Sequence, residues 1–287
     1  MRYVAPAREA VDQRVFARMP LAAWRACADL LEGPHWPSID ALNTRLPAGG
    51  ATRFIAQTRE LLADGLHYEQ RIAAHGLVAT RERNWHDLFN ALVWLRHPAL
   101  KRALNARQVA EIARVGPKQR TRAQCALTHF DEAGVIVTLR DPALLALWDA
   151  HDWHGLFWRR RDAWLDGSIE VAVIGHALLE HALTPRQLLV GKALAVAASG
   201  ERSDSIGACT EAVRDARLLC DPQELRPLPL SGIPGWHAGN DDEAFHRTTP
   251  CYQPLRKGRV YPPPLRLTPL STAAAADGCY EVITGAG

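Results

Sequence analysis

The stretch NWHDLFNALVWLRHP, residues 84–98, most strongly limits what this chain can fold into. Asn84 can cap the N-terminus of a helix, with Asp87 three residues further on as a variant of the capping box. Pro98 ends this helix, because the residue before a proline is pushed out of the α region. Apolar side chains lie on most sides of the helix between these two signals. We therefore expect the rest of the chain to pack around it.

The uncharged polar side chains of this helix are gathered in one narrow sector. At about 100° per residue, His86, Asn90 and His97 fall within roughly 40° of one another. His86 and Asn90 are one helical turn apart, where both can reach the same ligand, metal ion or water. The sector indicates either a helix that lines a site or a core helix whose polar groups are paired. The alternative for His97 is a structural role, in which its ring lies at the helix end and hydrogen-bonds a free backbone carbonyl.

A second group of candidates lies in GHALLEHAL, residues 175–183. His176 and Glu180 are one turn apart on an expected helix. At this spacing they can share a divalent metal, or the carboxylate can orient the imidazole as a general base. A buried hydrogen-bonded pair is the alternative, and the pattern is not H-E-x-x-H. The candidate catalytic residues are thus His86, Asn90, His176 and Glu180, with His86, His176 and Glu180 as candidate ligands of an unidentified divalent metal.

The remaining patterns predict an α+β fold, with a mostly helical single core and short β-hairpins. Two hairpins are expected, at residues 67–81 around Gly76 and at residues 125–139 with DEAG as the turn, although the first half of the second could be helical. That turn would carry Asp131 and Glu132, and turn chemistry explains Asp131 without any function. Asn105 is expected to cap a further helix.

The C-terminal third changes in character. Residues 227–237, PLPLSGIPGWH, are rich in proline and glycine, and we expect an extended segment laid over the body with Trp236 as its buried anchor. We expect one globular domain over residues 1–240. Residues 241–287 have few periodic apolar residues and are expected to form an extended, partly mobile tail.

Composition limits the functional classes. The net charge of +3 comes from 34 basic and 31 acidic residues, so nucleic acid is not expected as a partner. The six cysteines form no C-x-x-C pair, and the sequence contains neither a secretory signal nor a run long enough to span a membrane. We expect a cytoplasmic protein with free thiols and a small polar molecule as its ligand. Motifs of P-loop, dinucleotide-binding and α/β-hydrolase proteins are absent. The oligomeric state is left open.

The ordered motifs TRERNWHDLFNALVWLRHPALKRALN, ALTHFDEAG, GHALLEHAL and PLPLSGIPGW resemble a bacterial domain-of-unknown-function family, number 3025. The resemblance spans roughly residues 50–240 and implies that these segments belong to one domain. It supplies no activity.

Three functions remain. The first is a metal-dependent or acid/base hydrolase acting on a small polar substrate. The second is a non-catalytic protein that binds a ligand or partner, with buried structural His, Asn and Glu pairs. The third is a nuclease that resembles the ββα-metal arrangement, with the expected hairpin at residues 67–81, and His67 or His75 as its base, ahead of the helix that carries His86.

Overall fold

The larger sheet is built around β3 (Gly134–Leu139), a strand whose six residues are all buried. The computed structural model describes residues 3–199 and 203–267, and in them the strand order is β4-β3-β5-β6, with β7 also pairing β5. The other strands are β4 (Ile169–Val173), β5 (Val190–Ala197), β6 (Arg226–Pro229) and β7 (Leu265–Arg266). β3 is antiparallel to β4 and parallel to β5. Burial on both faces suits the apolar, β-branched run GVIVTL.

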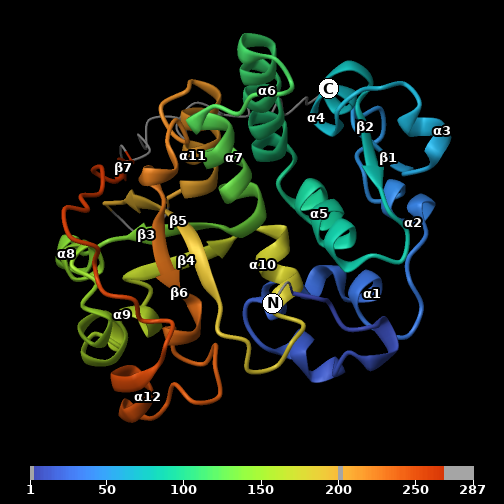
Figure 1. Cartoon of the computed structure of the whole chain (residues 1–287). Coiled ribbons are helices and arrows are strands. Elements are labelled where there is room, and N and C mark those ends of the chain that lie inside the picture. Colours follow the sequence, from blue (N-terminus) through green and yellow to red (C-terminus); the bar gives the residue numbers. More distant parts are fainter. Residues whose placement is uncertain (1–2, 200–202, 268–287) are drawn as a thin grey trace, which may run out of the picture.

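Helices surround this sheet and extend to one side of it (Figure 1). The α-helices are α1 (Ala28–Leu31), α2 (Ile39–Asn43), α3 (Arg59–Leu62), α4 (Tyr68–His75), α5 (Trp85–Arg96), α6 (Pro98–Val115), α7 (Arg122–Ala133), α8 (Pro142–Asp149), α9 (Asp162–Leu165), α10 (His176–His181), α11 (Ser205–Arg214) and α12 (Glu243–Thr248). Short 3-10 helices cover Arg8–Ala10, Gln13–Ala17, Leu21–Cys27, Pro222–Glu224 and Leu230–Gly232, and a π-helical turn covers Gly155–Arg159. α7 packs on β3 and β5, α6 on α4 and α7, and α5 on α6 and α10. The fold is α+β and mostly helical, as predicted.

The hairpin predicted at residues 67–81 is wrong. Tyr68–His75 form helix α4, and Leu77–Thr80 form β2, which pairs in parallel with β1 (Arg53–Ala56). Gly76, expected in the hairpin turn, instead ends α4 in the left-handed conformation, with φ of 68°. A glycine at this position is a common helix stop, because it has no Cβ to clash there.

At residues 125–139 the structure has the alternative that the sequence left open: the first half is helical and belongs to α7, and only the second half is a strand, β3, so no hairpin forms there. The side chain of Thr121 accepts from the backbone N–H of Gln124, and the Gln124 side chain accepts from the backbone N–H of Thr121. This capping box starts the helix. Asp131 and Glu132 therefore lie in the last turn of a helix, not at a turn tip. Asn105 starts no helix either, since α6 runs through it.

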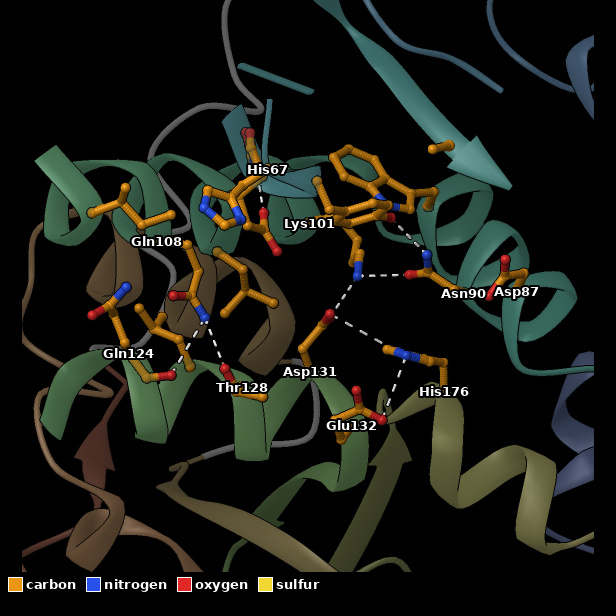
Figure 2. Close-up of a pocket in the computed structure, with 18 of the residues that line it drawn as sticks. His67, Asp87, Asn90, Lys101, Gln108, Gln124, Thr128, Asp131, Glu132 and His176 are labelled. Atoms are coloured by element: carbon orange, nitrogen blue, oxygen red, sulfur yellow. Dashed lines mark hydrogen bonds and ion pairs between the residues drawn. The ribbon is translucent and has the colours of Figure 1, made fainter. Parts of the chain in front are cut away.

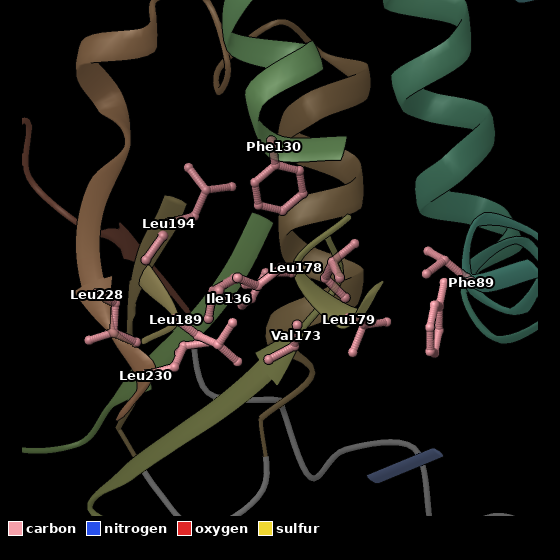
Figure 3. Packing of buried hydrophobic residues seen from close by; sticks show 14 of the residues in the cluster. Phe89, Phe130, Ile136, Val173, Leu178, Leu179, Leu189, Leu194, Leu228 and Leu230 are labelled. Carbon is pink, nitrogen blue, oxygen red and sulfur yellow. The ribbon is translucent and has the colours of Figure 1, made fainter. Parts of the chain in front are cut away.

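One cluster of buried apolar side chains connects the sheet to the helices (Figure 3). Ile136 on β3 is 1% exposed, and Phe130 on α7, Leu179 on α10 and Phe89 on α5 are fully buried. Burying a side chain of this size contributes about 1.5–3 kcal/mol. The apolar sides of α5 are packed as expected, so α5 and α10 have fixed positions relative to the sheet.

The proline-rich segment joins the sheet as β6, which pairs with Val190–Ala193 of β5. Trp236 packs against the core but is only half-buried, and Leu228 and Leu230 are the fully buried anchors. In the segment expected to be a tail, the described part contains α12 and β7, while residues 268–287 lie outside the described residues. The domain division at residue 240 stays a prediction. Among the described helices, none combines the length and the apolar character needed to cross a bilayer.

Candidate functional site

Helix α5 directs His86 and Asn90 towards α6, α7 and α10. The side chain of Asn84 caps the helix by accepting from the backbone N–H of Asp87 at 3.0 Å, as the sequence predicts. The helix ends at Arg96. His97, the residue before Pro98, is its C-cap. His86 keeps 29% of its side chain exposed, whereas Asn90 is buried.

The start of α10 lies directly against the junction of α7 and β3. The backbone N–H groups of Ile174 and Gly175 both donate to the carbonyl of Gly134 at 2.9 Å. A Cβ on Gly175 would lie 2.4 Å from the Cα of Ala133, so only glycine fits this approach. His176, the next residue, is thereby placed beside the end of α7 and is 4% exposed.

The two histidines meet through their Nε2 atoms, which are 3.0 Å apart. Oε2 of Glu132 lies 3.9 Å from Nε2 of His86 and 3.7 Å from Nε2 of His176. A tetrahedral ion with bonds of about 2.0–2.1 Å holds its ligand atoms about 3.3–3.4 Å apart. These three side chains can therefore surround one metal ion after only small shifts, and among the described residues they form a group of ligand atoms within 4.8 Å of one another.

Each histidine also has a carboxylate at its other ring nitrogen. Oε2 of Glu180 lies 3.2 Å from Nδ1 of His86, and Oδ2 of Asp131 lies 3.9 Å from Nδ1 of His176. Because a carboxylate only accepts, Glu180 favours the His86 tautomer with its proton on Nδ1, which leaves the Nε2 lone pair facing Glu132 and His176. Metal-binding histidines are usually held by a carboxylate in this way.

A buried hydrogen-bond network continues from Asp131 (Figure 2). Nζ of Lys101 donates to Oδ1 of Asp131 at 2.5 Å and to Oδ1 of Asn90 at 2.9 Å. The amide of Asn90 in turn donates to the hydroxyl of Tyr68 at 2.8 Å. Lys101 is 3% exposed, so this ammonium is held in a fixed position by its two partners.

The charges of this cluster suit a divalent cation. Three carboxylates, of Glu132, Glu180 and Asp131, and the ammonium of Lys101 surround the histidines. With the carboxylates ionised and both imidazoles neutral, two negative charges are left without a balancing cation. One divalent ion would neutralise them.

The environment shifts the pKa values of these groups in different directions. The hydrogen bond with Glu180 raises the pKa of His86, although burial opposes this shift. Burial lowers the pKa of His176 to about 3, so this imidazole is neutral at pH 7. Burial works against ionisation of Asp131, but the charge of Lys101 leads the effects that hold its pKa below the ordinary value. Burial raises the pKa of Glu132.

The cluster opens onto a cavity of about 550 Å³, within the range of small-molecule sites. Trp94, Leu104 and Leu127 form apolar parts of its wall, but most of the lining is polar, with residues such as Asn105 and Gln108. Figure 2 shows Gln108 pointing into the space between α6 and α7.

Residues 52–256 match the family described as protein of unknown function, DUF3025. The chain belongs to this family. The resemblance drawn from the motifs is confirmed, and every residue that lines the cavity lies within the matched part of this DUF3025 protein. No curated protein and no solved structure shows significant similarity to the chain.

The DUF3025 domain brings three of the four candidate residues into direct contact, since His86 touches both His176 and Glu180. Glu180, a candidate metal ligand, lies at Nδ1 of His86 and not at the gap between the Nε2 atoms, so it orients His86. Asn90 belongs to the Lys101 network. His97 takes no part and packs edge-on against the ring of Trp24.

Sequence reasoning did not assign Glu132, Asp131, Lys101 and Tyr68 to the site. Glu132 and Asp131 were noticed, but the incorrect hairpin placed them at a turn tip. The capping box that starts with Thr121 was the signal for a helix there. Lys101 is one of four lysines in an arginine-rich chain, but composition alone does not assign a single lysine to a site.

The nuclease-like arrangement has no support from the geometry. It required a hairpin at residues 67–81, and α4 occupies most of that stretch. His67 is the N-cap of this helix and His75 is its last residue. Neither belongs to the group of converging ligand atoms.

Proposed function

We propose that this protein is a metal-dependent hydrolase of a small polar substrate, with His86, His176 and Glu132 as its metal ligands. The observation that carries the proposal is the convergence of two Nε2 atoms and one carboxylate oxygen at the wall of a polar cavity. Three protein ligands leave positions open for water and substrate, as in catalytic zinc sites. Two histidines and one carboxylate also suit Fe(II) and Mn(II).

The other residues of the cluster have distinct roles in this proposal. A divalent ion held by His86, His176 and Glu132 would act as a Lewis acid and would lower the pKa of a bound water towards neutrality. Glu180 holds the imidazole of His86 in the orientation that ligation requires, and Asp131, 3.9 Å from Nδ1 of His176, can do the same for His176 after a small movement. Nζ of Lys101 makes two hydrogen bonds and lies 5.5 Å from the ring centroid of Trp94, and its third N–H has no hydrogen-bond acceptor among the described residues, so it can donate to a substrate oxygen.

Metal content tests the ligand assignment. The full chain, purified without a metal-affinity tag, should contain about one equivalent of Zn, Mn or Fe by plasma mass spectrometry. His86→Ala and His176→Ala should each lose it. His181→Ala is the matched control, because its ring contacts Tyr3 outside the cluster. Full metal content in folded His176→Ala would favour the alternative, in which these pairs are structural.

Hydrolysis is tested separately. A panel of ester, amide, phosphoester and N-glycoside compounds should reveal an activity that a chelator abolishes and one equivalent of metal restores. An activity that survives complete metal removal would favour acid/base hydrolysis, and a metal-loaded protein without any hydrolysis would favour a binding role.

We also propose a cytoplasmic location. The five cysteines within the described residues are free thiols, as in proteins of a reducing compartment. Fractionation of the native host, with the protein detected by an antibody, tests this assignment.

A further inference from the structure

Three buried amide side chains on α6 and α7 line the cavity beside the candidate metal ligands. Asn105, Gln108 and Gln124 are only 7%, 8% and 4% exposed, yet all three border the cavity. Figure 2 shows Gln108 and Gln124 grouped near Thr128, opposite Glu132 and His176. Burying an amide side chain costs folding free energy unless its polar atoms find hydrogen-bond partners.

Each of these amides uses only one of its two polar atoms within the described residues. Nδ2 of Asn105 donates to Glu69, at 2.9 Å to its carbonyl and 2.5 Å to its carboxylate. Nε2 of Gln108 donates to Oγ1 of Thr128 at 3.1 Å and to the carbonyl of Gln124 at 3.4 Å. Oε1 of Gln124 accepts from the backbone of Thr121.

The unused atoms are two acceptors, Oδ1 of Asn105 and Oε1 of Gln108, and one donor, Nε2 of Gln124. All three remain accessible, since none is among the enclosed unpartnered atoms of the described residues. A primary carboxamide has the complementary set, because its NH₂ group offers two donor hydrogens and its oxygen accepts.

Hydrogen-bonding groups and charges at this end of the cavity together favour a neutral ligand over an anion. The carboxylate of Glu69 is largely buried and has no ion-pair partner among the described residues, and burial raises its pKa. Arg120 is exposed and already donates to Thr128 at 3.0 Å. Arg81 and Lys101, which also line the cavity, are paired with Asp87 and Asp131. A bound carboxylate would place its oxygens against Glu69 and against two further acceptors, Oδ1 of Asn105 and Oε1 of Gln108, whereas the cation without an ion pair among the described lining residues, Arg120, is exposed and bonded to Thr128.

We propose that Asn105, Gln108 and Gln124 form a recognition subsite for an uncharged primary carboxamide of the substrate. The inference deepens the proposed function and rests on it in one respect, that the ligand is a substrate whose reacting bond lies near His86 and His176. The carboxamide itself is bound and not cleaved. Glu69 determines specificity by excluding anionic analogues.

A matched pair of probes tests the subsite. Nicotinamide and nicotinate share a ring and differ in carboxamide against carboxylate. Both are titrated at pH 7.5 into the chelator-treated full chain, with binding followed by saturation-transfer NMR. Nicotinamide should bind at least tenfold more tightly than nicotinate. Gln108→Met and Asn105→Leu should each weaken nicotinamide binding about tenfold, because the side chains keep their size and lose their acceptor.

Two further variants complete the test. Gln223→Met is the control, since the side chain is exposed and does not line the cavity, and nicotinamide binding should not change. Glu69→Gln should strengthen nicotinate binding and so reduce the ratio of nicotinamide to nicotinate affinity. If the role of Glu69 is purely structural, the substitution should leave this ratio unchanged.

Three results would overturn the inference: equal or tighter binding of nicotinate to the wild-type chain, no binding of nicotinamide, or unchanged binding in folded Gln108→Met. All measurements use metal-free protein. A chain that binds nicotinamide as described but takes up no metal would refute the proposed function and leave the carboxamide subsite standing.

Discussion

His86 and His176 have opposite environments, although they face the same gap. His86 is partly exposed and hydrogen-bonded to Glu180, whereas His176 is buried and its Nδ1 has no hydrogen-bond partner among the described residues. An unpaired buried ring nitrogen costs about 1–3 kcal/mol. If Nε2 of His176 binds a metal, the proton must sit on Nδ1, where Asp131 can accept it after a small movement. Metal binding would therefore relieve this cost.

Glu180→Gln tests the orienting role of that carboxylate. The amide can still reach Nδ1 of His86 but no longer favours the required tautomer. The dissociation constant for Zn²⁺, measured by competition with a chromophoric chelator, should rise about 10–100-fold. Glu211→Gln on α11 is the control and should bind Zn²⁺ as the wild type does. An unchanged affinity in Glu180→Gln would remove Glu180 from the metal centre.

Because His97 is buried, we expect it to make the free energy of unfolding depend on pH, independently of the candidate site. Burial lowers its pKa from 6.5 to about 4. Between these values the unfolded chain binds the proton and the folded chain does not, so the stability contributed by His97 is lost as pH falls from about 6.5 to about 4. The difference in unfolding free energy between wild type and His97→Gln should shrink by about 1–3 kcal/mol over this window. Urea unfolding at several pH values measures it, and a constant difference would contradict the burial argument.

At the scale of elements, the site depends on how closely α10 approaches the end of α7. Gly175 has φ of −64°, which any residue adopts, so its role comes from contact and not from backbone conformation. The contact sets where His176 starts relative to Glu132. Small displacements matter here, because metal ligands must lie within a few tenths of an ångström of their positions.

Gly175→Ala should push the start of α10 away from the end of α7. The added Cβ meets the backbone of Ala133 and Gly134, which cannot rotate away, so we expect a loss of about 1–3 kcal/mol and at least tenfold weaker Zn²⁺ binding by the folded protein. Leu183→Ala removes a buried side chain just beyond α10 and should lose about 2–5 kcal/mol without weakening Zn²⁺ binding. Equal effects on metal affinity in both variants would show that stability, not position, controls the site.

Element prediction from the sequence succeeded where local signals were unambiguous. Asn84 and Pro98 mark the two ends of α5 as expected, because a capping residue and a proline act on their immediate neighbours. It failed at Gly76, which suits a hairpin turn and a helix end equally well. At α7 it left a hairpin and a helix both open, because the β-branched run after residue 133 favours a strand, whereas the capping box at Thr121 favours the helix.

At the scale of the whole molecule, the candidate site joins three segments that are distant in sequence. His86 on α5, Glu132 on α7 and His176 on α10 meet because the core packs all three helices against one another and the sheet. Local sequence patterns identified both histidines but could not show which carboxylate completes the cluster. Spacing favoured Glu180, one turn from His176, whereas tertiary packing placed Glu132 at the gap.

The C-terminal segment should stabilise the body to which it is attached. Arg226 is 2% exposed, and it donates to Asp149 at 2.7 Å and to the carbonyl of Pro262 at 2.6 Å. Tyr252 stacks on Phe157. Shortening the chain to residues 1–240 removes Pro262 and Tyr252, so we expect a melting temperature at least about 5 °C below that of residues 1–267. Equal melting temperatures would support the predicted domain boundary at residue 240 and contradict this account.

The central claim is that His86, His176 and Glu132 hold one metal ion. Anomalous diffraction at the zinc edge, from crystals of the full chain grown with one equivalent of Zn²⁺, tests it most directly. The account predicts one strong peak about 2.0–2.2 Å from Nε2 of both histidines and from a carboxylate oxygen of Glu132. A peak bonded to Glu180 in place of Glu132, or fully bound zinc located away from this cluster, would contradict it.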